Sequence, residues 1–317
     1  MDLRQLRYFV AIADRGSFSA AASAINVAQS ALSRHIRQLE EELGGQIFER
    51  GARGVALSES GRILLDRARY ILDQLDNIAA EVSRENREVS GSVRFGAASS
   101  LADILYEPIA RHIVNHFPRI QLRLSTGLTE DLNGRLLRGA LDIAVVTEPR
   151  PNDHLEYELL FREQNYLIGP PGDPLFKRKC ITSAALAGLK MILPLSTDER
   201  ERIPNTVRSN ILSDSVIPMK RMARAGLGYA LLPYSGVCED IASGALGATK
   251  VLHSASTRIL VLPRGRPIAR ATRELVNVLR QECSLLIRAG TIQVQQTQRV
   301  GRRAYRKHPS PANQGPG

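Results

Sequence analysis

The 317-residue chain contains no tryptophan, has three cysteines and lacks any long apolar run. Cys180, Cys238 and Cys283 are far apart and form no CxxC or Cys/His pattern, which predicts reduced thiols rather than a disulfide framework. No segment approaches the roughly 18–20 apolar residues that span a bilayer, and the first residues do not resemble an export signal. We therefore expect a cytoplasmic protein without membrane contact, with cysteine redox sensing as the weaker alternative.

Enzyme motifs are missing as well. The chain contains no P-loop, GxSxG or GxGxxG motif. His112 and His116 share a helical face, but the glutamate of a zinc-protease motif does not lie between them. The sequence therefore predicts no catalytic residue, no metal and no cofactor.

The positive charge of the chain is unevenly distributed. The formal net charge is +11, yet residues 1–90 hold 12 arginines, no lysine and 13 acidic residues and so carry a net −1. Overall charge thus does not indicate nucleic-acid binding, and only the placement of single arginines can do so. Residues 291–317 form a basic, Pro/Gly-rich tail that we expect to be disordered. A role of this tail in clamping DNA is the weaker alternative.

Residues 17–43 predict two helices joined by a tight turn, in which Ser17 caps the first helix. Four apolar residues at intervals of 4, 3 and 4 predict one buried face of the second helix: Leu32, Ile36, Leu39 and Leu43. The opposite face carries hydroxyls, an amide and guanidinium groups, which hydrogen-bond to phosphates and to base edges in the major groove. The candidate DNA contacts on it are Gln29, Ser30, Ser33, Arg34 and Arg37.

The flanking segments extend this motif. Residues Leu3–Ala13 predict a preceding helix, Asn26 marks the turn, and Ile47–Leu57 predicts a β-hairpin wing. Three helices and a wing make a winged helix-turn-helix, which we place at residues 1–58. Arg50 and Arg53 of the wing are predicted to reach phosphates or the minor groove, with solvated loop arginines as the alternative.

Residues 59–90 predict one long helix with a heptad stripe. The stripe consists of Leu64, Ala68, Ile71, Leu75, Ile78 and Val82. A helix of about 30 residues is about 45 Å long, which a single small domain cannot bury. The stripe therefore predicts dimerisation through this helix, which would present two recognition helices to paired half-sites. Ser90–Ser92 is expected to act as a hinge.

From Val93 onward, short apolar segments alternate with amphipathic ones. This alternation predicts an α/β domain at residues 91–290, with lobe 1 at about 91–149 and 267–290 and lobe 2 at about 155–262. The expected strands are 93–97, 120–125, 141–146, 155–161, 166–169, 191–195, 229–233 and 258–262, and a further element of lobe 2 is expected at 219–225. Helices are expected at 101–116, 130–137 and 268–288, the last returning to lobe 1. The overall class is thus α/β, with an all-α N-terminal module.

Candidate effector contacts lie at the ends of the first strands. Ser99 and Ser100 precede a helix, and their hydroxyls and the free N–H groups of that helix are suited to an anion or carboxylate. Thr129 lies at the next strand-to-helix turn, and Thr147 at the expected hinge. Simple helix capping is an equal alternative for the two serines, and a structural role is favoured for the two threonines.

Residues 3–61 resemble the N-terminal domain of LysR-type transcriptional regulators across almost their whole length, LRQLRYFVAIADRGSFSAAASAINVAQSALSRHIRQLEEELGGQIFERGARGVALSESG. The resemblance implies a bacterial regulator in which a long helix joins the winged module to a two-lobed effector-binding domain, of the type found in periplasmic binding proteins. It implies double-stranded DNA, a small-molecule effector, RNA polymerase and a second copy, in a dimer or tetramer, as partners. It further implies that Gln29, Ser30, Ser33 and Arg34 read the operator, that Arg53 lies at the wing tip, and that Ser99 and Ser100 touch the inducer.

The resemblance weakens in lobe 2. Residues 196–213 are short and polar where family members carry about one more helix and loop. A DNA-binding regulator whose effector domain no longer senses a ligand is therefore the alternative function. A solute-binding protein would fit the two lobes alone, but the preceding DNA-binding module argues against it.

Overall fold

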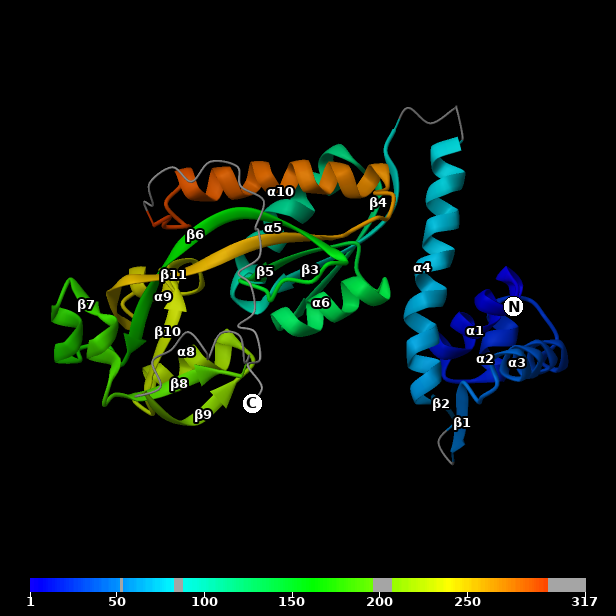
Figure 1. The fold of residues 1–317 in the computed structure, drawn as a ribbon, viewed down its shortest axis with the longest axis horizontal. Coiled ribbons are helices and arrows are strands. Elements are labelled where there is room, and N and C mark those ends of the chain that lie inside the picture. Colours follow the sequence, from blue (N-terminus) through cyan, green and yellow to red (C-terminus); the bar gives the residue numbers. More distant parts are fainter. Residues whose placement is uncertain (52–53, 83–87, 196–206, 296–317) are drawn as a thin grey trace, which may run out of the picture.

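The computed structural model describes residues 1–51, 54–82, 88–195 and 207–295. A helical module with a two-stranded hairpin forms the N-terminal part, and an α/β domain forms the C-terminal part (Figure 1). The long helix α4 (Glu59–Val82) stands between them (Figure 1). This is the architecture that the sequence predicts. In the described part of the chain, none of the helices combines the length and hydropathy that a bilayer crossing requires.

The N-terminal module has the predicted order of elements. They are α1 (Leu3–Arg15), α2 (Phe18–Ala24), α3 (Gln29–Leu43), β1 (Phe48–Gly51) and β2 (Gly54–Leu57). The side chain of Ser17 accepts a hydrogen bond from the backbone N–H of Ala20 at 3.4 Å, so the predicted cap of α2 is confirmed. Asn26 has a φ of 54° in the turn before α3, a left-handed conformation that asparagine tolerates better than most residues.

A single apolar core holds this module together. The fully buried side chains include Phe9 and Ile12 of α1 and Leu32 and Leu39 of α3. Ala68 of α4 belongs to the same core and has no exposed surface. The first turns of α4 are thus part of the N-terminal module, which rigidly joins the helix to it.

The α/β domain is built on one nine-stranded sheet, in the order β4-β3-β5-β11-β6-β10-β8-β9, with β7 paired to β11. The strands are β3 (Ser90–Ala98), β4 (Arg119–Gly127), β5 (Ile143–Thr147), β6 (Leu155–Gly169), β7 (Cys180–Thr182), β8 (Lys190–Pro194), β9 (Arg208–Ser213), β10 (Tyr229–Pro233) and β11 (Gly247–Pro263). The helices are α5 (Ser99–His116), α6 (Thr129–Arg138), α8 (Val216–Arg224), α9 (Cys238–Ala242) and α10 (Arg270–Arg288). Short 3₁₀ turns lie at Pro174–Lys177, Ser183–Leu186 and Tyr234–Gly236.

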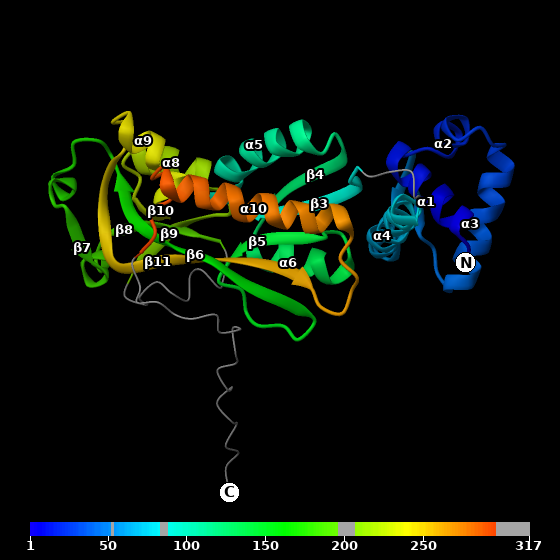
Figure 2. The ribbon, with the colours of Figure 1, turned by 90° about the horizontal axis from the view of Figure 1, so that it is seen from above.

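Two long antiparallel strands, β6 and β11, run through both lobes (Figure 2). The prediction of separate strands at 155–161 and 166–169 is wrong, because both segments belong to β6. The predicted strand 258–262 is the end of β11 and pairs with β5 of lobe 1. The polar residues Glu163, Gln164 and Asn165 interrupt the apolar pattern of β6, but they are buried with hydrogen-bond partners, so the strand continues through them.

Helix α10 returns to lobe 1, as predicted. Its Leu275 and Leu279 lie in one buried cluster with Leu105 and Ile109 of α5 and with strand residues such as Phe95. Lobe 2 has a separate core in which Met219 of α8 packs with residues of β6, β8 and β10. Of the segment predicted to lack a helix and loop, residues 196–206 lie outside the described residues, and strand β9 occupies the end.

Candidate nucleic-acid interface and ligand cavity

Helix α3 has one buried and one exposed face. Leu32, Ile36 and Leu39 are at most 2% exposed, as the spacing predicts. Leu43 was expected on the same face, but it is 45% exposed. It is the last residue of α3, directly before the C-cap Gly44, and the helix has passed the edge of the core at that point.

The predicted DNA-contacting side chains lie on the opposite face of α3. Gln29, Ser30, Arg34 and Arg37 are exposed, and Ser33 is half-buried. Helices α2 and α3 lie on the side of the N-terminal module that faces away from the α/β domain (Figures 1 and 2). The polar face is therefore open to a partner as large as a DNA duplex.

The predicted wing is an antiparallel hairpin. Phe48 pairs with Leu57, and Arg50 pairs with Val55 near the tip. The start of the hairpin is held by Glu40 of α3, whose Oε1 accepts a hydrogen bond from the N–H of Ile47 at 3.0 Å. Arg53 lies outside the described residues.

The predicted dimerisation stripe on α4 divides into two parts. Ala68 is completely buried in the core of its own chain and Leu64 is half-buried against that core, so Ala68 does not face a second chain. Farther along, Ile71 is 37% exposed and Ile78 is 55% exposed, and Leu75 is half-buried. The side chain of Val82 lies outside the described residues. The first turns of the stripe thus serve the intrachain core, and only the later turns present an apolar surface.

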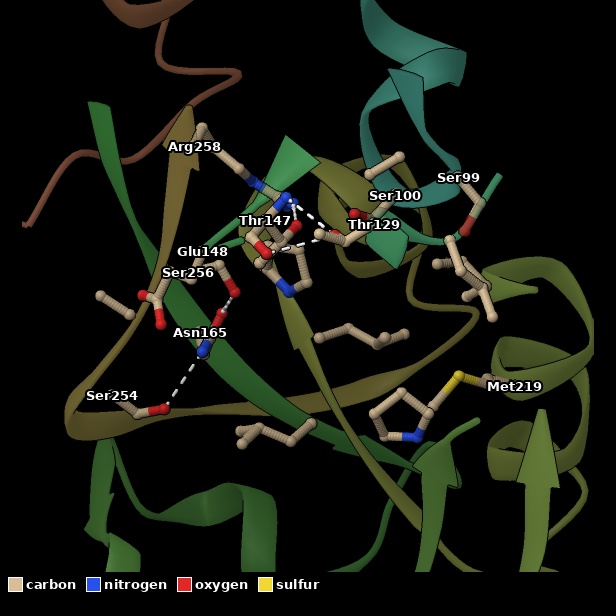
Figure 3. A pocket seen from close by; sticks show the side chains of 18 of the residues that line it. Ser99, Ser100, Thr129, Thr147, Glu148, Asn165, Met219, Ser254, Ser256 and Arg258 are labelled. Carbon is tan, nitrogen blue, oxygen red and sulfur yellow. Dashed lines mark hydrogen bonds between the residues drawn. The ribbon is translucent and has the colours of Figure 1, made fainter. Parts of the chain in front are cut away.

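The α/β domain contains a cavity of about 310 Å³ between its lobes. The N-termini of α5 and α6 and the end of β5 line it on the lobe 1 side, and β8, β9 and α8 line it on the lobe 2 side. All four residues predicted as effector contacts border it, namely Ser99, Ser100, Thr129 and Thr147 (Figure 3). The tertiary structure therefore brings together residues that the sequence places at three separate turns.

Ser99 and Ser100 are the first two residues of α5. The N-cap is Ala98, and no side chain caps this helix, so the alternative that the serines merely cap it is wrong. The Ser99 hydroxyl donates a hydrogen bond to the carbonyl oxygen of Asp214 in lobe 2, at 3.5 Å. The first N–H groups of an α-helix have no partners within the helix, so this end of α5 offers donors to the cavity.

Thr129 and Thr147 have a different environment. They are 2% and 3% exposed, respectively, and bind each other. The Thr129 hydroxyl donates to the Thr147 carbonyl at 3.2 Å and accepts from the Thr147 N–H at 3.3 Å. These bonds tie the start of α6 to the end of β5, which is the structural role favoured for them on sequence grounds.

One residue of the cavity wall, Arg258, belongs to a buried ion pair. Arg258 of β11 and Glu163 of β6 are at most 1% exposed, and their Nη2 and Oε2 atoms are 3.3 Å apart. Arg258 also donates to the Thr147 hydroxyl, and Glu163 accepts from the N–H of Ser235 at 2.7 Å. This pair was not predicted from the sequence, because the two residues are 95 positions apart and both strands carry other charged or polar residues.

Further polar side chains complete the wall between β6 and β11. Asn165 donates to Ser254 at 3.1 Å and accepts from Ser256 at 2.9 Å (Figure 3). Glu148, after β5, has a φ of 39° and accepts a hydrogen bond from the N–H of Thr257 at 3.0 Å. Arg162 lines the cavity as well and is exposed. The arrangement is suited to a small polar ligand rather than an apolar one.

None of the three cysteines lines this cavity. Cys180 is exposed, Cys238 is half-buried and Cys283 is buried. Burial raises the pKa of the Cys238 thiol above its ordinary value and that of Cys283 to about 12. Both thiols are therefore protonated at neutral pH, which opposes a role as a reactive redox sensor.

Two family models match most of the chain. Residues 3–62 match the model described as bacterial regulatory helix-turn-helix protein, lysR family. Residues 86–284 match the model described as LysR substrate binding domain. Most of α4 lies between the two matches, since the first ends at residue 62 and the second begins at residue 86.

Similar proteins include regulators from several bacteria. The HTH-type transcriptional regulator BbuR of Bordetella bronchiseptica is 32% identical over 254 residues, which is 78% of each chain. A probable hydrogen peroxide-inducible genes activator of Mycobacterium leprae is 31% identical and covers 76% of this chain and 81% of its own. Among solved structures, a full-length OxyR variant from Pseudomonas aeruginosa has a TM-score of 0.68 at 24% identity and covers 90% of this chain and 98% of its own. Full-length CbnR in complex with its target DNA has a TM-score of 0.53 at 20% identity and covers 89% of this chain and all of its own.

Proposed function

The chain belongs to the LysR family of bacterial transcriptional regulators, and from this membership we propose how it reads DNA and which kind of effector controls it. The family comprises DNA-binding regulators with an effector-binding domain, not enzymes. The proposed domains are the winged module at 1–58, the linker at 59–90, the effector-binding domain at 91–290 and a tail at 291–317. The expected bounds need two corrections: within the linker the helix covers Glu59–Val82 and strand β3 already begins at Ser90, and residues 291–295 pack on the effector-binding domain, where Ile292 is buried. We place the protein in the cytoplasm, where a bacterial regulator meets its DNA.

Operator recognition is assigned to α3 and the wing. Its support is that Leu32 and Leu39 hold α3 on the core while the polar face remains exposed. The residues proposed to contact DNA are Gln29, Ser30, Ser33, Arg34, Arg37, Arg50 and Arg53. Arg34 is the base-reading candidate, because a guanidinium fork can donate two hydrogen bonds to one guanine.

Dimerisation is assigned to the later turns of α4. Ile71 and Ile78 are exposed apolar residues of one helical stripe, and a second copy of the same helix offers a matching surface. A dimer, or a tetramer made of two dimers, would then present paired recognition helices to paired half-sites. Ala68 is omitted from the proposed contact, since it is buried within its own chain.

The effector is proposed to be a small anionic molecule, bound between the lobes. The observation that supports this most directly is the N-terminus of α5, uncapped by any side chain, with Ser99 and Ser100 beside the cavity. Arg162 adds positive charge to the same cavity. Arg258 contributes less, because Glu163 already neutralises it. Thr129 and Thr147 would shape the wall rather than donate to the ligand.

Effector binding is proposed to change the angle between the lobes, since the cavity walls belong to both. Helix α4 is fixed to the winged module through Ala68, and a residue of the same turn, Arg67, donates a hydrogen bond to the Leu137 carbonyl of lobe 1. The helix would therefore transmit the change to DNA bending and to contact with RNA polymerase. A regulator with a non-sensing effector domain is not favoured, because a cavity of about 310 Å³ with polar walls remains between the lobes.

The experiment that tests this function uses the full chain. Operator fragments are selected from genomic DNA, and thermal unfolding is then followed with a panel of small carboxylates. The proposal expects a preferred fragment, stabilisation by at least one carboxylate, and loss of that stabilisation in the Ser99→Ala/Ser100→Ala double variant. Operator binding without any stabilising ligand would contradict the proposed effector, and no preferred fragment would contradict the proposed DNA recognition.

A further inference from the structure

A second cavity, of about 200 Å³, lies where helix α4 faces lobe 1. It shares no lining residue with the cavity between the lobes. Its charged lining residues are four arginines and one aspartate: Arg69, Arg94, Arg123, Arg135 and Asp66. We propose that this cavity is a second anion site, which takes a small oxyanion of the phosphate class and is separate from the proposed effector cavity.

Two of the arginines converge from different elements of lobe 1. Arg123 and Ser125 are two residues apart on β4, so their side chains project from the same face of the strand. Arg135 of α6 donates a hydrogen bond from Nη2 to the Ser125 hydroxyl at 3.0 Å, which directs its guanidinium toward that face. Both guanidinium groups therefore border one cavity, and Ser125 adds a hydroxyl between them.

The charges of the other two arginines are balanced by close carboxylates. Arg94 is buried and has Asp142 at 2.7 Å and Asp73 at 3.5 Å. Arg69 forms an ion pair with Asp14 of the N-terminal module. These two arginines are held in place by protein charges, and they contribute positive potential rather than open donor groups.

Arg123 and Arg135 are not balanced in this way. In the described ranges, Arg123 donates only to the amide oxygen of Gln121, at 3.2 Å, and forms no ion pair. The nearest carboxylate in the described ion pairs of Arg135 is that of Asp131, at 3.8 Å along the same helix. Two guanidinium groups beside one cavity repel each other, and a shared anion would remove this repulsion.

A tetrahedral oxyanion matches this donor set. Planar guanidinium groups bind phosphate oxygens with two parallel hydrogen bonds, which gives both energy and orientation. The Ser125 hydroxyl offers a further donor or acceptor. Apolar lining is limited to Leu124, Ala140 and Leu141, so the cavity does not favour an apolar ligand.

Occupation of this site would also affect the junction between α4 and lobe 1. Arg69 belongs to α4, whereas Arg123 and Arg135 belong to lobe 1, so one anion would lie against both. The same junction is held by Arg138 with Asp66 at 3.4 Å and by Arg67, which donates to the Leu137 carbonyl at 3.2 Å. An anion here would therefore stabilise the contact through which α4 meets the effector-binding domain.

The test is calorimetric titration of the full chain with inorganic phosphate, at constant ionic strength maintained with chloride. We expect saturable binding, weakened about tenfold or more in Arg123→Gln and in Arg135→Gln, because each removes a charge-assisted hydrogen-bond donor. Arg111→Gln is the matched control, since Arg111 is an exposed arginine of α5 outside the cavity. Both variants should bind operator DNA normally without phosphate, which shows that they are folded.

Three results would overturn the proposal. They are the absence of saturable phosphate binding, equal affinity in Arg123→Gln and Arg111→Gln, and displacement of phosphate by duplex DNA without an operator. A parallel titration with glycerol phosphate distinguishes the source of the ligand. Binding of the ester supports a phosphorylated metabolite, and binding of inorganic phosphate alone supports the free ion.

Discussion

The two parts of this molecule place their polar residues in opposite ways. Among the described residues of the N-terminal module, Gln5 is the one buried polar side chain, and the candidate DNA contacts of α3 are exposed or half-buried. In its described part, the α/β domain instead buries eleven polar or charged residues, among them Arg258 and Glu163. Several of these lie along the middle of β6 and β11, where the strands pass from one lobe to the other.

This difference corresponds to the size of the partner. A DNA duplex is larger than the module that reads it, so recognition groups must project outward from an apolar core. A small ligand is enclosed, so its recognition groups must lie inside the domain. Buried polar groups cost free energy unless they are paired, which explains why the polar wall of the cavity is internally hydrogen-bonded.

The largest effect is expected for Glu163→Gln. It leaves the Arg258 guanidinium buried without a counter-charge, and we expect a loss of about 3–5 kcal/mol in the free energy of unfolding. Urea denaturation measures this loss. The matched control is Glu158→Gln, which breaks an exposed pair with Arg280 and should cost less than about 1 kcal/mol. Equal losses in the two variants would show that burial does not determine how much the Arg258–Glu163 ion pair contributes to the free energy of unfolding.

The next effect concerns the exposed stripe of α4. We expect Ile78→Asp to weaken dimerisation by about 1.5–3 kcal/mol per chain, since it places a carboxylate where an apolar side chain would be buried. Sedimentation equilibrium measures the association. Ile63→Asp is the control, because Ile63 is equally exposed on the same helix but lies outside the heptad stripe. If only Ile63→Asp weakened the dimer, the interface would lie on the face of α4 that carries Ile63 and not on the heptad stripe.

Arg34→Ala tests the outward polar face. We expect operator binding to weaken by about 1–3 kcal/mol, whereas the free energy of unfolding should change by less than about 0.5 kcal/mol. Fluorescence anisotropy with the operator and with random DNA separates the possible roles. A loss of affinity for the operator alone indicates a base contact, and an equal loss of affinity for the operator and for random DNA indicates a phosphate contact. Unchanged binding to both would remove Arg34 from the interface.

The smallest effect is expected for the thiols. Burial raises the pKa of the Cys238 thiol and raises that of Cys283 to about 12, which keeps both protonated. Alkylation by iodoacetamide at pH 8 should therefore be restricted to Cys180 and should vanish in Cys180→Ser. The neutral buried thiol contributes stability that is complete below the unfolded pKa near 8.5 and is lost as pH rises toward about 12. Hydrogen peroxide should leave operator binding unchanged. A change in operator affinity on treatment with peroxide would instead support redox sensing as a function.

Sequence periodicity predicted the N-terminal module well, because the apolar residues of its helices recur every three or four positions, as in a regular α-helix. Leu32, Ile36 and Leu39 are buried as expected, and only Leu43 at the helix end differs. The same reasoning divided β6 into two strands. The polar residues 163–165 were interpreted as a break between two strands, because the sequence does not show their hydrogen-bond partners. Those partners are Ser235, Val251 and Ser254, which are far away in the chain.

The sequence by itself determined the order of the elements in the N-terminal module, the two faces of α3 and the serines and threonines at the strand ends, because each depends on residues within a few turns of one another. Only the tertiary structure decided that those hydroxyls border one cavity, that Ala68 serves the core of its own chain, and that Arg258 meets Glu163 across 95 residues. The physical reason is that burial and charge compensation are properties of contacts, and residues distant in the chain make these contacts.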